Sequence, residues 1–300
     1  MFKRLILPLD GSRLSEAVLP TAIYLAQKLR ASITLVHIIE RNAPKQVHGE
    51  PHLSKPEEAE AYIAGVRERL VPSGIPVEMH VHTVAIADVA QSIVDHAREF
   101  ESDLVMMCTH GRGGLRKLLF GSIAQQVVAL KVPVLLVRPG ESGSAPIPTG
   151  KPFLLPLDGT EIREAALPVA AALAQACGAH LKLLMVVPTF DTLSGVETPS
   201  RILLPATTQE MLALAYEDAG KYVAAWIARL GAQGVEASAE LRRGDETEII
   251  AREAQHLGVD LIVMGTAARA GMDAFWSGSV APKVSERTHL PLLLIPAQEV

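Results

Sequence analysis

The sequence predicts two tandem α/β domains, each built on a parallel sheet that is covered by helices. The first observation is a repeat, because Leu5–Ser12 (LILPLDGS) recurs as Phe153–Thr160 (FLLPLDGT), 148 residues later. The second is the alternation of short apolar runs with longer helical patterns through both copies. The third is composition: 49% hydrophobic but only 4% aromatic residues suit buried sheets of Leu, Val and Ile under Ala-rich helices.

The repeat also sets the expected domain boundaries. We expect residues 1–140 to form the first domain and residues 152–300 the second, with residues 141–151 as the linker. The stretch Pro139–Gly150 supports this division, because it is dominated by Pro, Gly and Ser, as linkers are.

A second pair of anchors shows where the copies differ in length. Asp103–Met107 matches Asp260–Met264 with a separation of 157 residues rather than 148. The second copy therefore has nine added residues, which we place around Pro188–Pro205. Long polar or Pro-containing loops are predicted at Arg41–Ser54 and Pro188–Thr208, where they would be mobile segments or lids.

The elements of the first copy are predicted in the following order. Strands are expected at Arg4–Leu9, Ile33–Ile39, Pro76–Thr83, Leu104–Cys108 and Val134–Arg138. Helices are expected at Leu14–Leu29, Lys55–Val71, Asp88–Phe100 and Ser122–Leu130. The second copy is predicted to run the same way, from a strand at Phe153–Leu157 to one at Leu292–Pro296. Each copy would be a doubly wound, Rossmann-like domain of five parallel strands in the order 3-2-1-4-5, which binds ligands at the carboxyl ends of its strands.

Met107–Ile123 (MCTHGRGGLRKLLFGSI) is the stretch most suggestive of a binding site. A strand, a Gly-rich loop and a helix start follow one another there, and this order brings unpaired N–H groups to face an anion. Strands 1 and 4 are neighbours in the predicted sheet, so Asp10 at the end of strand 1 would face the loop. Asp10 would accept hydrogen bonds from a base or ribose, or it would cap a helix together with Ser12; the residues favour neither reading over the other.

These motifs resemble the universal stress proteins, whose nucleotide loop reads G-x2-G-x9-G-[ST]. The first copy has Cys108-x2-Gly111-x9-Gly121-Ser122 and the second has Gly265-x2-Ala268-x9-Gly278-Ser279. The copies thus lack different glycines of one pattern. If the missing glycine requires positive φ, a side chain there costs about 1–2 kcal/mol. The resemblance covers essentially the whole chain.

The resemblance implies binding of ATP, ADP or AMP, with Mg²⁺ as a companion ion. In the first copy it implies the site residues Pro8, Asp10, Ile38, Met107, Cys108, His110, Gly111, Arg112, Gly121, Ser122 and Ile123. In the second copy it implies Pro156, Asp158, Val186, Met264, Gly265, Ala268, Gly278, Ser279 and Val280. We favour the first copy, because Arg112 suits a phosphate chain whereas Asp273 in the second copy would repel it.

Three functions stay open at this point. The first is a nucleotide-binding regulatory protein of the stress response, the second a nucleotide-free scaffold with degraded sites, and the third a weak ATP hydrolase. The sequence shows no general base or metal-holding carboxylate pair beside the loop, so whether the chain is an enzyme is unresolved and a non-catalytic role is favoured.

Partners and location follow from charge, cysteines and the repeat. The net charge of −5 predicts no nucleic-acid partner, and no apolar run is long enough to predict a membrane span. Two distant cysteines and the lack of a secretory h-region favour the cytoplasm. The apolar strands Val134–Arg138 and Leu292–Ile295 are expected to pair across a pseudo-two-fold axis, giving an intramolecular pseudo-dimer, with a further homodimer permitted.

Two histidine pairs are also visible. His48-x3-His52 has the spacing of a metal pair but lies in a predicted loop, so a solvated loop is the favoured interpretation. His80-x-His82 would put both rings on one face of a strand, and we interpret it as a sheet-face pair rather than a ligand pair.

Overall fold

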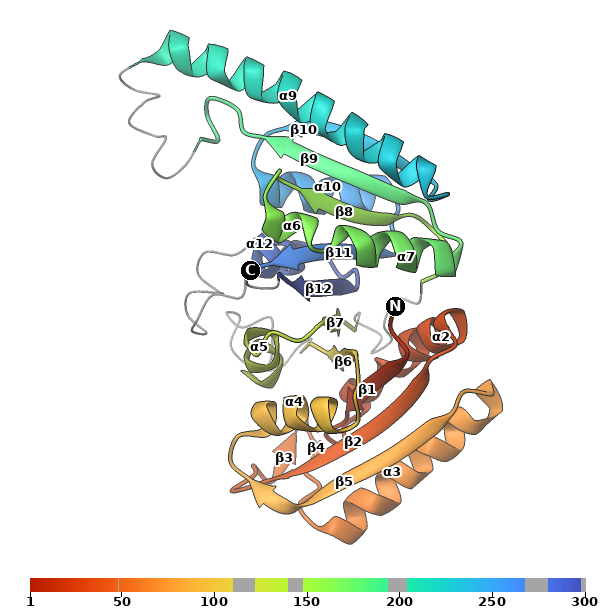
Figure 1. Ribbon diagram of the computed structural model, residues 1–300. Coiled ribbons are helices and arrows are strands. Elements are labelled where there is room, and N and C mark those ends of the chain that lie inside the picture. The colour runs from red at the N-terminus through yellow and green to blue at the C-terminus, as the bar shows by residue number, and fades with distance from the viewer. Residues whose placement is uncertain (48, 110–121, 140–147, 194–203, 268–279, 298–300) are drawn as a thin grey trace.

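The computed structural model describes residues 1–47, 49–109, 122–139, 148–193, 204–267 and 280–297 (Figure 1). The described strands form one ten-stranded sheet in the order β10-β9-β8-β11-β12-β7-β6-β1-β2-β5, together with a small two-stranded sheet, β3-β4. Each half of the chain supplies five neighbouring strands of the large sheet. Among the described residues, no helix has both the length and the apolar character that crossing a membrane requires.

The first half begins with β1 and ends with β7. Its strands are β1 (Arg4–Pro8), β2 (Ser32–Glu40), β3 (Gln46–Val47), β4 (Glu50–Pro51), β5 (Val77–Ile86), β6 (Leu104–Cys108) and β7 (Val134–Val137). Its helices are α1 (Arg13–Glu16), α2 (Leu19–Leu29), α3 (Pro56–Leu70), a short 3₁₀ turn η1 (Val71–Ser73), α4 (Val89–Glu99) and α5 (Ser122–Ala129).

The second half repeats this order. Its strands are β8 (Phe153–Leu157), β9 (Leu181–Val187), β10 (Ala237–Arg243), β11 (Leu261–Thr266) and β12 (Leu292–Pro296). Its helices are α6 (Glu161–Glu164), α7 (Leu167–Cys177), α9 (Pro205–Ala232), α10 (Glu246–His256) and α12 (Val280–Arg287).

The strand order agrees with the sequence prediction in both halves. Within the first half the large sheet reads β5-β2-β1-β6-β7, and within the second β10-β9-β8-β11-β12, which is the order 3-2-1-4-5 twice. Within the large sheet, all strand pairs inside each half are parallel. The order reverses between β1 and β6 in the first half and between β8 and β11 in the second, so these are the points where a ligand crevice is expected.

The two halves join through their last strands. β12 pairs with β7 in antiparallel fashion, with Leu293 opposite Leu135. This confirms the pairing predicted for the two apolar edge strands, which would otherwise expose unpaired backbone groups. Helices α2 and α7 also meet across the junction, where Ala26 and Ala174 are buried in the same cluster.

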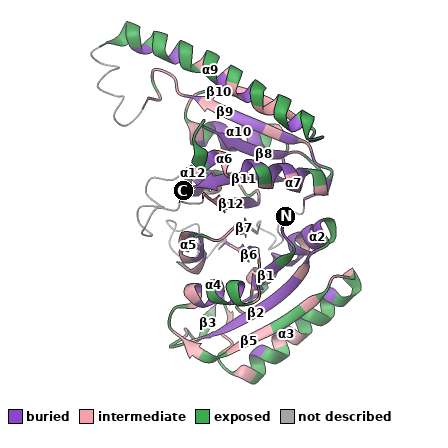
Figure 2. Cartoon of the chain, in the orientation of Figure 1, coloured by how far each residue is buried: buried purple, intermediate pink, exposed green. Residues whose placement is uncertain are grey.

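Helices cover both faces of the sheet, and the strands alternate between two cores. Leu5 and Leu7 of β1 belong to the core under α2, α3, α7 and α9, while Ile6 belongs to the core under α4, α5, α10 and α12. Figure 2 shows the central strands as buried and the outer surfaces of α3 and α9 as exposed. This alternation follows from the period of two along a strand.

Two predicted elements differ in the structure. The single helix predicted at Leu14–Leu29 is broken into α1 and α2, because Pro20 has no N–H to donate to the carbonyl of Glu16 and its ring crowds that carbonyl. The residues added to the second copy lie mainly in a helix rather than in the predicted loop, since α9 has 28 residues where α3 has 15.

Candidate functional site

A cavity of about 320 Å³ opens at the carboxyl ends of β1, β2 and β6 in the first half. It lies at the reversal of strand order, and its volume falls at the lower end of the range of about 300–1,000 Å³ that small-molecule sites occupy. The residues around it are mainly apolar with a few polar groups, and they are Pro8, Leu9, Asp10, Ser15, Val36, His37, Ile38, Glu40, Pro44, His52, Val89, Ile93, Met107, Cys108, Ile123 and Ala124.

Asp10 has two roles in this arrangement. Its Oδ1 accepts hydrogen bonds from the backbone N–H of Ser12 (2.9 Å) and from the Ser12 hydroxyl (2.6 Å). Ser12 is the N-cap of α1, because its Oγ accepts from the N–H of Ser15. Asp10 therefore orients the capping residue, and it also lines the cavity. A carboxylate has about four acceptor positions, so both readings of Asp10 from the sequence are compatible.

The segment between β2 and α3 folds over the cavity. His37 of β2 places its Nδ1 2.7 Å from the carbonyl oxygen of Leu9 and its Nε2 3.3 Å from that of Leu53. The Leu53 side chain lies against Gly11, where an added Cβ would come within 2.7 Å of it, and Gly11 has φ +91°. The backbone angle therefore favours glycine at this turn, and a larger residue would also displace the Leu53 side chain.

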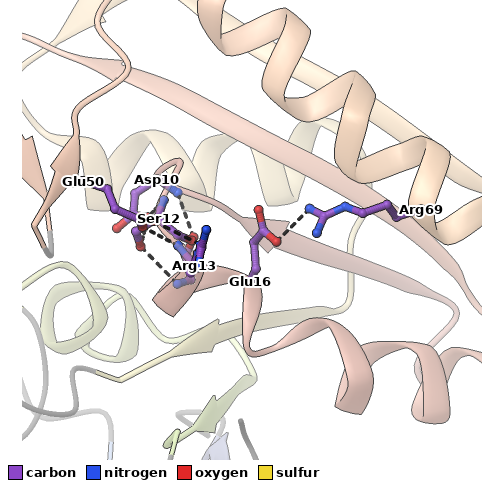
Figure 3. Close-up of polar contacts among 7 residues, drawn as sticks. Asp10, Ser12, Arg13, Glu16, Glu50 and Arg69 are labelled. Carbon is purple, nitrogen blue, oxygen red and sulfur yellow. Dashed lines mark hydrogen bonds and ion pairs between the residues drawn. The ribbon is translucent and has the colours of Figure 1, made fainter. Parts of the chain in front are cut away.

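Polar contacts tie the same segment to α1 (Figure 3). Glu50 of β4 accepts a hydrogen bond of 2.6 Å from the N–H of Arg13. On the other side of α1, Arg69 of α3 donates to Glu16 at 2.7 Å. His52, from the same segment as Glu50, lines the cavity, and its buried Nδ1 has no hydrogen-bond partner within the described part of the chain. The short helix α1 is thus fixed from both sides, and it carries Ser15 to the cavity wall.

Cys108 closes the cavity at the end of β6. Burial, and then the negative charge of Asp10, raise the pKa of the Cys108 thiol to about 12, so Cys108 is a neutral thiol at physiological pH. It lies in a strand and is not among the residues with positive φ. The cysteine therefore causes none of the backbone strain that replacing a glycine at positive φ would cause.

The structure brings six of the first copy's predicted residues to one cavity. Pro8, Asp10, Ile38, Met107, Cys108 and Ile123 all line it. Ser122 is the first residue of α5, next to Ile123. The other four, His110, Gly111, Arg112 and Gly121, lie outside the described residues.

In the second half, an arginine occupies the space that corresponds to this cavity. Arg163 takes the place of Ser15, 148 residues earlier in the repeat, and it is buried. Its Nε lies 3.5 Å from Asp158 Oδ2, one terminal nitrogen lies 3.2 Å from Glu246 Oε1, and the other donates to the carbonyl of Gly265 at 3.5 Å. In the repeat, these three partners correspond to Asp10, Val89 and Cys108 of the first copy. Arg163 therefore reaches across the whole width of the corresponding site.

The charged groups of this arginine cluster act on one another. Burial raises the pKa of Glu246, the charge of Arg163 lowers it, and the charge of Asp158 raises it. Asp158 Oδ1 accepts from the N–H (2.9 Å) and hydroxyl (2.6 Å) of Thr160, the N-cap of α6, as Asp10 does from Ser12. Asp158, which the family resemblance implies as a nucleotide contact, is thus paired with Arg163 of its own chain.

Close packing of α6 against β11 narrows the second site further. A Cβ added at Gly265 would come within 2.0 Å of the carbonyl oxygen of Ile162, whereas Cys108 holds a side chain at the equivalent position. Of the other predicted residues, Pro156 and Met264 are buried in their strands, and Val186 and Val280 are partly buried. Ala268, Gly278 and Ser279 lie outside the described residues.

The sequence reasoning missed several residues of both sites. In the first half these include His37 of β2, His52 of the β2–α3 segment, and Val89 and Ile93 of α4. In the second half it missed Arg163 and Glu246. A signal for the second pair was present, because aligning the repeats places arginine and glutamate opposite Ser15 and Val89 at positions next to the site.

Comparisons with known proteins agree with this architecture. The chain is 33% identical over 144 residues to a universal stress protein of Thermus aquaticus, covering 46% of this chain and 100% of the relative. It is 29% identical over 146 residues to one of Methanocaldococcus jannaschii, covering 46% and 83%. A crystal structure of a universal stress protein from Archaeoglobus fulgidus has the same fold at 16% identity, with a TM-score of 0.67 over 99% of this chain and 97% of that one.

The family comparison covers both halves of the chain. The model of the Universal stress protein family matches residues 1–138 and again residues 150–296. The two matches coincide with the two five-stranded halves and leave out the Pro- and Gly-rich stretch between them. The chain therefore belongs to the universal stress protein family, with two copies of the family's domain in tandem.

Proposed function

We propose that the first half of the chain binds an adenine nucleotide, ATP or its relatives AMP and ADP, with Mg²⁺ as a companion of the phosphates. The observation that carries this proposal is the cavity at the end of β1 and β6, with Asp10 on its wall. Ile38, Met107 and Val36 provide apolar surface for a flat base. Asp10 provides an acceptor for an amino group or a ribose hydroxyl.

The phosphate chain of the bound nucleotide would extend out of the cavity along the first turn of α5. Ile123 and Ala124 of that turn line the cavity, so the unpaired N–H groups at the start of α5 are close to a ligand bound there. Ser122 and the predicted loop residues His110, Gly111, Arg112 and Gly121 would complete the phosphate site. This part of the proposal rests on the sequence motif.

We propose that the role of the nucleotide is regulatory rather than catalytic. Two of the titratable groups that line the cavity, His37 and Asp10, are already engaged in structural contacts. His37 has both ring nitrogens near backbone carbonyls, and Asp10 Oδ1 accepts two hydrogen bonds from Ser12. A general base needs a position free to take a proton from a reacting group, and these contacts favour holding the ligand over transforming it.

The second half would serve as a nucleotide-free scaffold. Arg163 already forms ion pairs with Asp158 and Glu246, and a nucleotide would have to displace it. In this proposal, residues 1–140 and 152–300 are two domains of a pseudo-dimer joined by residues 141–151, and the antiparallel pair β7–β12 is its interface. A homodimer of whole chains and a cytoplasmic location, which two free cysteines favour, belong to the same proposal.

Matched aspartate variants test the proposal. Asp10→Asn should weaken ATP binding by about 10–100-fold, because a hydrogen bond to a charged group contributes about 1.5–3 kcal/mol. Asp158→Asn is the control, since it alters the same position of the repeat in the half that we propose does not bind. Equilibrium dialysis with labelled ATP measures both. Equal affinities for the two variants would overturn the assignment of the site to the first half.

A further inference from the structure

Three histidines meet on the outermost strand of the first half, away from the nucleotide cavity. His80 and His82 lie two residues apart on β5, the strand at the end of the ten-stranded sheet. Their side chains therefore point to the same face. His96 of α4, the helix that packs on the neighbouring strand β2, lies against both rings, with ring centroids 4.5 Å from His80 and 5.0 Å from His82. The sequence alone showed only the first two of the three.

The nitrogen atoms of this trihistidine cluster converge. One nitrogen from each ring lies within 4.8 Å of the other two. His96 Nε2 is 3.0 Å from His82 Nδ1. The Nε2 atoms of His80 and His82 are both buried, and neither has a hydrogen-bond partner among the described residues. Buried polar atoms are usually paired, so these two nitrogens indicate a missing partner at this place.

The third histidine is held in the way that metal-binding histidines are held. His96 Nδ1 is 2.9 Å from Glu99 Oε2, and a carboxylate on the far nitrogen fixes the tautomer and orients the other nitrogen toward an ion. Phe100 lies parallel to the His96 ring at 5.6 Å and meets the His80 ring edge-on at 5.1 Å. The ring positions are thus constrained by neighbours on the same helix.

In the second half, the corresponding place is occupied by the guanidinium of an arginine. Val77 and Ala237 pair with equivalent residues of β2 and β9, so Glu240 and Arg242 correspond to His80 and His82. His96 and Glu253 each lie eight residues after the N-cap aspartate of their helix. Arg242 lies 2.9 Å from Glu240 and 3.1 Å from Glu253. The second copy therefore holds a guanidinium between two carboxylates where the first has three imidazoles.

We propose that His80, His82 and His96 form a binding site for a divalent transition metal ion of the zinc class. The ion would take the place that the guanidinium of Arg242 takes in the second half. Imidazole is a ligand for Zn²⁺, Cu²⁺, Ni²⁺ and Fe²⁺ and not for Mg²⁺ or Ca²⁺. Three histidines leave a fourth position for water or a ligand from outside, as in open zinc sites.

The geometry requires only small ring movements. In a tetrahedral zinc site with Zn–N bonds of about 2.0–2.1 Å, the ligand nitrogens are about 3.3 Å apart. The present upper limit of 4.8 Å would have to shorten by up to about 1.5 Å when an ion binds.

Zinc titration of the full chain tests this site. Isothermal titration with Zn²⁺, in the presence of a competing chelator, should show one ion per chain, and X-ray absorption at the zinc edge should show three imidazole ligands. Fewer than three imidazoles in the wild-type protein, or no Zn²⁺ binding above that of a His80→Asn/His82→Asn/His96→Asn variant, would overturn the proposal and leave the cluster as a packing contact.

Variants separate the metal ligands from the surrounding residues. His96→Asn should weaken Zn²⁺ binding by more than the about 10–100-fold expected for loss of the supporting carboxylate in Glu99→Gln. His256→Asn is the matched control, since His256 is exposed on α10 and should leave binding unchanged. The exchange His80→Glu/His82→Arg/His96→Glu introduces the ion pairs of the second half, and this variant should fold and lack the site. Retention of wild-type affinity in that exchange would contradict the proposal.

Discussion

A chain carrying Ser15→Arg and Val89→Glu should lose ATP binding by about 100-fold or more, which corresponds to about 2.7 kcal/mol of binding free energy. These substitutions copy into the first half the two residues that fill the second. Ser15 and Val89 both line the cavity, and their counterparts Arg163 and Glu246 are 3.2 Å apart. The introduced arginine would span the cavity to Asp10 and occupy the volume proposed for the base.

The control for this exchange is Ser15→Ala/Val89→Ala. It removes the same two side chains without filling the cavity, so ATP affinity should stay within a few-fold of wild type. Thermal unfolding of both variants, measured alongside dialysis with labelled ATP, establishes that the fold is kept. Wild-type ATP affinity in the folded Ser15→Arg/Val89→Glu chain would show that the nucleotide binds elsewhere.

Removal of Arg163 is expected to have the largest effect on stability. Arg163→Ala leaves Asp158 and Glu246 facing each other without their cation, and both are about two-thirds buried. Removing one partner of a fully buried ion pair costs about 3–5 kcal/mol, and we expect about 2–3 kcal/mol here because both carboxylates are partly exposed. Urea unfolding near neutral pH measures the difference.

The pH dependence of this loss has a defined sign. Burial raises the pKa of Glu246 and Arg163 lowers it, so the pKa rises further in Arg163→Ala. A carboxyl whose folded pKa is raised loses stability as the pH rises through that pKa. The deficit of the variant should therefore be greatest near neutral pH and shrink as the pH falls toward about 5.

A second variant distinguishes the charge effect from lost packing. Arg163→Ser/Glu246→Val gives the second half the residues of the first, and it should recover most of the stability that Arg163→Ala loses, because it removes a stranded carboxylate. An unfolding free energy for Arg163→Ala within about 0.5 kcal/mol of wild type, the range of ordinary surface substitutions, would contradict the role given to this ion cluster.

The fold was accessible from the sequence because its determinants are local or repeated. The apolar runs gave the strands, and β6, β8 and β12 have the predicted bounds. The repeat of Leu5–Ser12 as Phe153–Thr160 gave the two halves, and the unprotected apolar strands gave the pairing of β7 with β12. The carboxyl-end rule for parallel sheets predicted that Asp10 faces the loop after strand 4, and the family resemblance added Ile38 and Met107; these three residues line one cavity.

The features that sequence reasoning missed depend on contacts between distant residues. In the sequence, Arg163 looks like an ordinary helix residue. Only the packing of α6 against β11 brings it to Glu246, 83 residues away. His96 joins His80 and His82 only because α4 packs on β2, the strand next to β5. The helix break at Pro20, by contrast, is a local effect. Proline lacks a backbone N–H, and this alone predicts a break in the helical pattern.

The number of ATP molecules bound per chain tests the central claim, that one half has an open site and the other is filled by its own arginine. Equilibrium dialysis of the wild-type chain with labelled ATP up to millimolar concentration should saturate at one nucleotide per chain, because Arg163 occupies the second site. Saturation at two nucleotides per chain, or no binding at millimolar ATP, would contradict this account.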